Sequence, residues 1–295
     1  MGKGRGKGFL YASFKINWKL LAASVLGAAA VFAVLFTVSA ATVEQGVEIP
    51  VVMYHSVLKD RAYHGKYVIS PDELESDMKY LNDHGYTTIL PRDLIAYTKG
   101  GELPEKPIML TFDDGYYNNY LYAFQLAKQH QCKFVISPIG YFSEFYTESG
   151  EKNGYYTHCT WEQLKEMADS GLVEVENHSY DLHKSSKSPV GVKKMSGETE
   201  QQYRERLTAD LEKAQAAIEE AVGTAPQTFV YPFGAVSATT PEIVKELGFS
   251  CTLTCEERTG KVTRDPESLY GLGRFLRPSG VSSKEFFTKR MKLPE

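Results

Sequence analysis

Two adjacent carboxylates, Asp113 and Asp114, directly follow an apolar run at 108–112. Ionised carboxylates at the end of a buried strand are costly unless a partner compensates their charge. Asp-Asp-Gly is also a common turn sequence, so the pair alone leaves both a turn and a reactive site open. Imidazole and carboxylate together, without thiolate, form a ligand set typical of divalent metals such as zinc. Three histidines at or near the ends of other strand-like segments therefore favour the reactive site: His55, His178 and His183.

The spacing of the two later histidines excludes a helical metal motif. Residues five apart on a helix point about 140° apart, and on a strand they point to opposite faces. His178 and His183 can therefore meet on one ion only if the segment between them forms a loop. Asp181, inside this segment, is predicted either to orient a histidine ligand or to serve as a turn residue.

Repeated strand–helix units must position these side chains. The alternation predicts a parallel sheet covered by helices, with insertions at 141–159 and 184–197. About seven units favour a (β/α) barrel, complete or incomplete, and a doubly wound open sheet is the alternative. In a barrel, the C-terminal strand ends share one rim, where the carboxylates and histidines would meet. Strands are predicted at 51–54, 86–90, 108–112, 133–137, 172–176, 228–231 and 250–254, and helices at 70–85, 91–100, 119–130, 160–171, 199–222 and 240–248.

The N-terminal segment differs from the rest of the chain. Residues 1–19 contain basic side chains and no acid, and residues 20–41 contain no charge. A helix over that apolar segment would be about 33 Å long, which is enough to span a bilayer core. The basic flank predicts that the N-terminus lies inside the cell and the rest outside. We therefore predict a cytoplasmic tail at 1–19, a transmembrane signal anchor at 20–42 and an extracellular catalytic domain at 43–295. A signal peptide cleaved near Ala40, with secretion of the domain, is the alternative.

Net charge and cysteine positions exclude two further kinds of function. The whole chain has a net charge of −4 and its first 42 residues carry +5, so the remainder is −9. An acidic domain argues against nucleic acid as a partner. Cys251 and Cys255 lie in one strand-like segment, about 13 Å apart if extended, and cannot form a disulfide with each other there. We predict no catalytic cysteine, and the sequence does not indicate an oligomeric state.

Three motifs in this order resemble those of the polysaccharide deacetylases (carbohydrate esterase family four, the NodB homology domain). They are TFDDG at 111–115, HSYDLH at 178–183 and VYPFG at 230–234, and weaker similarity covers most of residues 49–280. The resemblance implies a hydrolase that removes N-acetyl groups from N-acetylglucosamine in cell-surface polysaccharide. It also implies one divalent metal, with Zn²⁺ favoured and Co²⁺ or Ni²⁺ as alternatives.

The resemblance also implies a role for each motif residue. Asp114, His178 and His183 are expected to bind the metal. Asp113 is expected to act as the general base. The backbone N–H of Phe233 is expected to stabilise the oxyanion.

Three departures from the commoner pattern resemble the branch that deacetylates poly-β-1,6-N-acetylglucosamine. The histidines of the second motif are five residues apart instead of four, Val230 stands where the family has an arginine, and no histidine follows His183. The resemblance to this branch implies that His55 replaces the missing late histidine as general acid. Arg274 is a candidate to replace the missing arginine beside Asp113, but a structural ion pair is the role that we favour for it.

Substrate contacts are expected from aromatic side chains, because their flat faces bind sugar rings. We select Tyr116, Tyr141 and Trp161 as substrate-binding candidates. Peptidoglycan, chitin oligomers or acetylated xylan could serve as substrates of the same site. The alternative to an enzyme is a sugar-binding protein that is related to the family but does not catalyse a reaction.

Overall fold

The computed structural model describes residues 46–184 and 190–294. The chain divides into two units after residue 45, and the second unit contains all the described residues. The predicted tail at 1–19 and span at 20–42 lie outside the described residues. Between residues 46 and 294, as far as the structure describes them, no helix combines the length and apolarity needed to cross a membrane.

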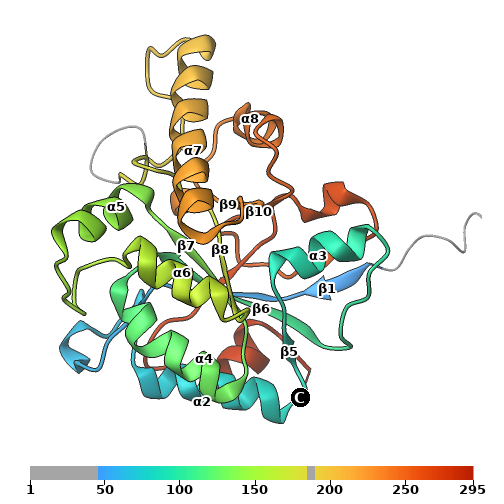
Figure 1. Ribbon diagram of the computed structural model, residues 1–295. Coiled ribbons are helices and arrows are strands. Elements are labelled where there is room, and N and C mark those ends of the chain that lie inside the picture. The colour runs from blue at the N-terminus through green and yellow to red at the C-terminus, as the bar shows by residue number, and fades with distance from the viewer. Residues whose placement is uncertain (1–45, 185–189, 295) are drawn as a thin grey trace, which may run out of the picture. The chain divides into compact units, whose positions relative to one another are not determined.

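Parallel strands form the centre of the fold (Figure 1). Every residue of the central strand β6 is buried, as expected for a parallel sheet covered on both faces. Alternate residues of this strand enter different cores. Leu110 packs with residues of the surrounding helices, whereas Met109 packs with side chains from the strands and from 89–97. The strand order is β12 (Phe275–Leu276), β2 (Val51–Tyr54), β6 (Pro107–Asp114), β7 (Phe134–Pro138) and β8 (Val173–Val175), and β5 (Thr87–Thr88) also pairs with β6.

A separate parallel pair, β9 (Thr228–Val230) and β10 (Cys251–Leu253), lies beyond β8. Isolated bridges connect Asn177 with Phe229 and Leu253 with Leu272, so backbone pairing continues on both sides of this pair. The regular ladders nevertheless remain separate. The structure therefore establishes an α/β fold with a parallel sheet, and it does not confirm the (β/α) barrel, complete or incomplete, that the sequence predicted.

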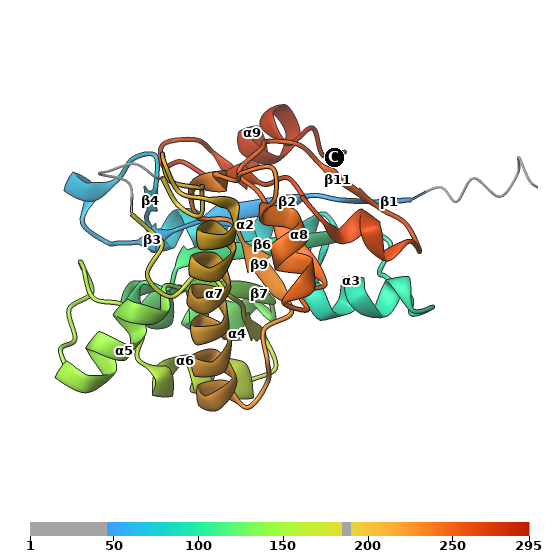
Figure 2. The ribbon, with the colours of Figure 1, turned by 90° about the horizontal axis from the view of Figure 1, so that it is seen from above.

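Helices cover the strands on more than one side (Figure 2). Figure 2 shows α5, α6 and α7 on one side of β2 and β6, and α9 on the other. The sequence signals for helix starts are confirmed: Ser70 forms a capping box with Glu73, and Pro71 is the first residue of α2. The helices are α2 (Pro71–Asp83), α3 (Pro91–Thr98), α4 (Phe124–His130), α5 (Gly140–Ser149), α6 (Trp161–Asp169), α7 (Glu200–Val222), α8 (Thr240–Glu246) and α9 (Ser283–Glu285).

One segment differs from its prediction. Residues 141–159 were predicted to be an insertion, but Gly140–Ser149 form helix α5, which ends at Gly150 in a left-handed conformation. Its buried residues are Gly140, Ser143 and Tyr146, so no strongly apolar stripe at helical spacing marks this helix in the sequence. The helix predicted at 119–130 consists of η2 (Asn119–Ala123) followed by α4. The remaining elements are too short for periodicity to predict: β1 (Val47–Ile49), β3 (Ser56–Val57), β4 (Val68–Ile69), β11 (Gly260–Val262), η1 (Arg61–Tyr63), η3 (Pro232–Gly234), η4 (Pro266–Leu269) and η5 (Phe286–Arg290).

Candidate active site

The C-terminal ends of the parallel strands converge on one cavity of about 680 Å³. Strand β6 ends at Asp114, and β2 is followed directly by His55. This volume suits a small ligand or one part of a larger one. Predicted residues from four different strand ends line the cavity: His55, Asp113, Asp114, Tyr116, His178, His183 and Phe233.

Asp114, His178 and His183 form a candidate metal site. Their ligand atoms lie within 4.8 Å of one another. Nε2 of His183 is 3.2 Å from Oδ1 of Asp114, and Nε2 of His178 is 3.6 Å from the same oxygen. Among the described residues, this buried Oδ1 has no hydrogen-bond partner. A carboxylate oxygen that converges with two imidazole nitrogens fits a divalent cation.

The tautomer of His178 supports this fit. Its Nδ1 lies 2.7 Å from the carbonyl oxygen of Val230, which can only accept a hydrogen bond. Nδ1 therefore carries the proton, and Nε2 presents its lone pair toward Asp114. Burial lowers the pKa of His178 to about 3, which keeps the ring neutral as a metal ligand must be.

Burial also dominates the electrostatics of Asp114. Burial, together with the neighbouring charge of Asp113, raises the pKa of this carboxyl to about 6, although the charge of His55 opposes the shift. Two buried carboxylates side by side are unfavourable without a compensating cation. A bound metal would supply that charge.

The segment between the two histidines forms a loop, as their spacing predicted. Asp210 on α7 accepts hydrogen bonds from the backbone N–H groups of Tyr180 and Asp181, at 2.8 and 2.9 Å. Ser179 has a left-handed backbone, and its N–H donates to Oδ1 of Asn177 at 2.8 Å. The Asp181 carboxylate contacts Lys184. Asp210, which sequence reasoning missed, therefore fixes this loop, and nothing in its helical sequence context marks it.

A buried ion pair holds Asp113. Arg274, fully buried, donates to both carboxylate oxygens of Asp113 at 2.6 and 2.8 Å, and also to Thr111 and to the carbonyl of Thr254. Burial alone would raise the pKa of Asp113, but the charge of Arg274 and its hydrogen bonds hold this pKa below its usual range. Asp113 is therefore ionised and fixed in orientation.

His55 lies next to this pair. Its Nε2 is 4.0 Å from Oδ2 of Asp113, and its ring contacts that of Tyr67 at a centroid distance of 4.9 Å. Nδ1 of His55 is buried and has no hydrogen-bond partner within the described part of the chain. The imidazole of His55 lines the same cavity as the candidate metal ligands.

Backbone strain collects at the same place. Asp114, Ser179 and Phe233 have φ values of 69°, 72° and 58°, a region that non-glycine residues seldom occupy. Such conformations persist where the surrounding structure enforces them, and they cluster at functional sites. The ring of Phe233 lies 4.2 Å from that of His183.

The chain matches the family model "Polysaccharide deacetylase" over residues 100–252, more than half of its length. This chain belongs to the polysaccharide deacetylase family. The matched segment contains the candidate metal ligands and Asp113. His55 and Arg274, which flank Asp113, lie outside it.

Relatives and solved structures support the assignment. The chain is 28% identical over 256 residues to poly-beta-1,6-N-acetyl-D-glucosamine N-deacetylase of Escherichia coli (strain K12), covering 80% of this chain and 37% of that protein. It therefore spans well under half the length of that curated relative. IcaB from Ammonifex degensii is 29% identical, with a TM-score of 0.64 over 82% of this chain and 95% of that one. A de-N-acetylase from Aggregatibacter actinomycetemcomitans is 25% identical, with a TM-score of 0.68 over 82% and 100% of the two chains.

The aromatic candidates of this deacetylase-family chain occupy different places. Tyr116 lines the cavity and stacks on His158 at 4.8 Å. Tyr141 on α5 is exposed, and Trp161 begins α6 and packs against the core, but neither is among the cavity-lining residues. Sequence reasoning missed several cavity-lining residues: Lys66, Tyr67, Cys255, Glu257 and Arg290. For Lys66 and Tyr67, the aromatic and basic composition of 61–67 was the available signal.

The four cysteines, all within the described residues, are free thiols. Burial raises the pKa of Cys132, Cys159, Cys251 and Cys255, which disfavours the nucleophilic thiolate. Their environment is consistent with the absence of a catalytic cysteine predicted from the sequence.

Proposed function

We propose that this protein is a metal-dependent deacetylase that hydrolyses the N-acetyl groups of N-acetylglucosamine units in a cell-surface polysaccharide. One observation carries the proposal: the Asp114, His178 and His183 cluster shares a cavity with the Asp113–Arg274 pair. Poly-β-1,6-N-acetylglucosamine is the substrate that we favour. The name of the Escherichia coli relative and the three departures in the sequence motifs support this choice.

Asp114, His178 and His183 would hold the metal, and zinc fits their nitrogen and oxygen ligands best. When bound, such a metal activates water and polarises the acetamide carbonyl. Arg274 keeps Asp113 ionised and oriented, so that Asp113 can accept the proton of the attacking water.

Two further groups complete the proposed mechanism. The backbone N–H of Phe233 would stabilise the oxyanion that forms when water attacks the acetyl carbon. His55 would protonate the departing nitrogen, and its position 4.0 Å from Asp113 supports this assignment. The products would be acetate and a glucosamine unit with a free amine.

We also propose that residues 20–42 anchor the chain in the cell membrane with the domain outside. The apolar segment and its basic flank support this proposal. Fractionation of cells that express the full chain would test it. Recovery from the soluble cell interior would contradict both the anchor and the cleaved, secreted alternative.

The enzymatic proposal is tested with defined β-1,6- and β-1,4-linked N-acetylglucosamine oligomers. Purified protein is incubated with Zn²⁺, with Co²⁺ or after chelation, and released acetate and new amines are measured. We expect metal-dependent release that is faster on the β-1,6 series. Release from the β-1,4 series alone would overturn the favoured linkage. Absence of release from both series, with the protein folded and metal-loaded, would overturn the deacetylase proposal.

A further inference from the structure

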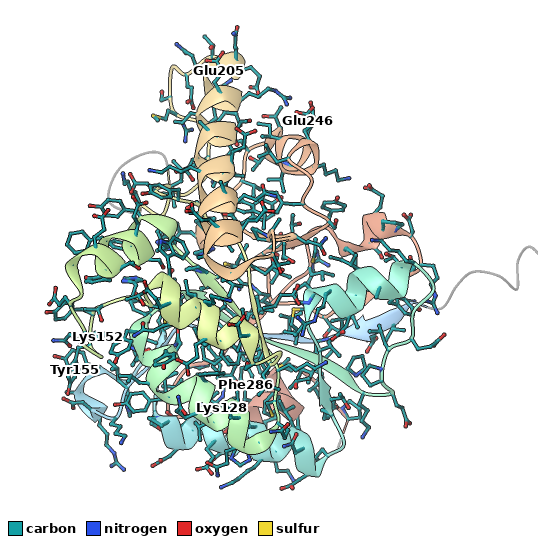
Figure 3. The ribbon with its side chains drawn as sticks, in the orientation of Figure 1. Lys128, Lys152, Tyr155, Glu205, Glu246 and Phe286 are labelled. Atoms are coloured by element: carbon teal, nitrogen blue, oxygen red, sulfur yellow. The ribbon has the colours of Figure 1, made fainter. Side chains whose placement is uncertain are left out.

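A pair of exposed tyrosines lies outside the cavity. Tyr63 and Tyr155 are 55% and 52% exposed, and their ring centroids are 5.3 Å apart with planes tilted by 53°. Tyr63 ends the short helix η1, and Tyr155 comes from the turn that follows α5. Figure 3 labels Tyr155 at the outer edge of the molecule, far from the end of α7 where Glu205 is labelled. Neither ring belongs to a core cluster among the described residues, so core packing does not explain the pair.

A buried asparagine holds the turn of Tyr155 in a fixed position relative to the cavity. Nδ2 of Asn118 donates to Oγ of Ser56 at 2.9 Å and to the carbonyl of Gly154 at 3.0 Å. Its Oδ1 accepts from the backbone N–H of Val57 at 2.9 Å. Ser56 lines the cavity, so the same side chain connects the cavity wall with the residue preceding Tyr155.

Tyr63 is tied to the cavity through strands β3 and β4. Their pairing places Ser56 opposite Val68, and the N–H of Ser56 donates to the carbonyl of Tyr67 at 3.0 Å. Tyr67 is 48% exposed, lines the cavity and contacts the ring of His55. Tyr63 lies four residues earlier, so its Cα is at most about 14 Å from that of Tyr67. Tyr67, which contacts the ring of His55, and Tyr63, which contacts that of Tyr155, therefore lie within the length of a short oligosaccharide of each other.

The size of the cavity indicates what the exposed tyrosines could bind. A volume of about 680 Å³ accommodates a small ligand but not a polymer, so a bound polysaccharide must continue over the protein surface. We propose that Tyr63 and Tyr155 bind an N-acetylglucosamine ring of the same chain, outside the unit that reacts. The inference rests on the proposed function. The tilted rings offer apolar faces to a pyranose ring, and their hydroxyl groups can hydrogen-bond its polar edge.

The test is the dependence of acetate release on oligomer length. For the wild-type protein, KM should fall as β-1,6-linked N-acetylglucosamine oligomers grow from two units to six or more. Tyr63→Ala and Tyr155→Ala should raise KM for the long oligomers by roughly tenfold and leave kcat/KM for the dimer unchanged. Tyr63→Phe should retain most of the long-oligomer affinity, because the ring face is preserved.

Tyr156→Ala is the matched control. Tyr156 is 51% exposed and follows Tyr155 directly, but its hydroxyl bonds to Glu151. Its removal should leave the length dependence unchanged. Identical length dependence in the wild type and both alanine variants would overturn the subsite, as would an equal effect of Tyr156→Ala. Absence of acetate release by the wild-type protein on every oligomer would instead overturn the proposed function.

Discussion

Asp113 and Asp114 are neighbours in the sequence, yet their environments differ. Arg274 holds Asp113 as an anion by two hydrogen bonds, whereas Asp114 faces two imidazole nitrogens and has its pKa raised to about 6 by burial. Both carboxylates line the same cavity, and Asp114 ends strand β6 with a left-handed backbone. Their different partners therefore give the two side chains different charge states and different roles.

Because of these environments, replacing each aspartate by asparagine should affect metal binding and acetate release differently. Asp114→Asn should abolish metal binding, because an amide is a poor ligand beside two neutral imidazoles. Asp113→Asn should retain the metal and lower kcat for acetate release by about 10²- to 10⁴-fold through loss of the base. Metal content of the purified variants and acetate release on one oligomer are the measurements. Wild-type release by Asp113→Asn would remove Asp113 from the role of base.

At the scale of elements, helix α7 supports the loop between His178 and His183, a role that its own sequence does not predict. It is long and capped at its start by Thr199, as local signals predict. Its Asp210 also reaches two backbone N–H groups of the loop between His178 and His183. The helix therefore supports the loop that brings His178 and His183 together at the candidate metal site, although their spacing suits no regular element.

Asp210→Ala should weaken metal binding by roughly 10- to 100-fold without removing a metal ligand. The loop N–H groups would lose their acceptor, and the two imidazoles would lose their fixed separation. Competition with a chromophoric chelator measures the affinity independently of catalysis. Glu212→Ala, an exposed change on the same helix, is the control and should bind metal as the wild type does. Equal affinities in all three proteins would contradict the supporting role of α7.

At the scale of the whole molecule, a second acidic pair lies away from the cavity. Glu174 and Glu176 alternate with Val173 and Val175, whose side chains pack in the core on the helix side. Glu176 is 1% exposed and accepts a hydrogen bond from the N–H of Thr228 at 2.6 Å. Burial, followed by the charge of Glu174, raises the pKa of Glu176 well above its usual value.

The raised pKa of Glu176 makes the free energy of unfolding depend on pH. Folding raises the pKa of Glu176 above its value in the unfolded chain, which is about 4.3. The protonated carboxyl therefore contributes fully to the free energy of unfolding at a pH below about 4.3. That contribution is lost as pH rises toward the folded pKa, where the buried carboxyl must ionise. Glu176→Gln should therefore be more stable than wild type at pH 7–8, by about 1 kcal/mol or more.

Urea unfolding between pH 5 and 8 measures this difference. The gap in unfolding free energy between Glu176→Gln and wild type should grow with pH. Glu162→Gln, an exposed change on α6, should give no such trend. A gap that stays constant or narrows as pH rises would show that Glu176 is ionised in the folded protein throughout this range.

The sequence by itself determined the features that depend on neighbouring residues. Hydrophobic periodicity and caps such as Ser70 predicted the strand–helix order, because helices and turns are specified within a few residues. The five-residue spacing of His178 and His183 predicted a loop, because no regular element can align them. The three motifs also indicated the family to which the chain belongs.

Only the tertiary structure decided the contacts between distant segments. The partner of Asp113 is 161 residues away at Arg274, and the support of the histidine loop comes from Asp210. Glu176 has the alternating pattern of a strand with one polar face, yet it is buried, and its carboxylate accepts a hydrogen bond from the N–H of Thr228 at the start of β9. Such contacts depend on how the strands are ordered in space, and local propensity contains no information about that order.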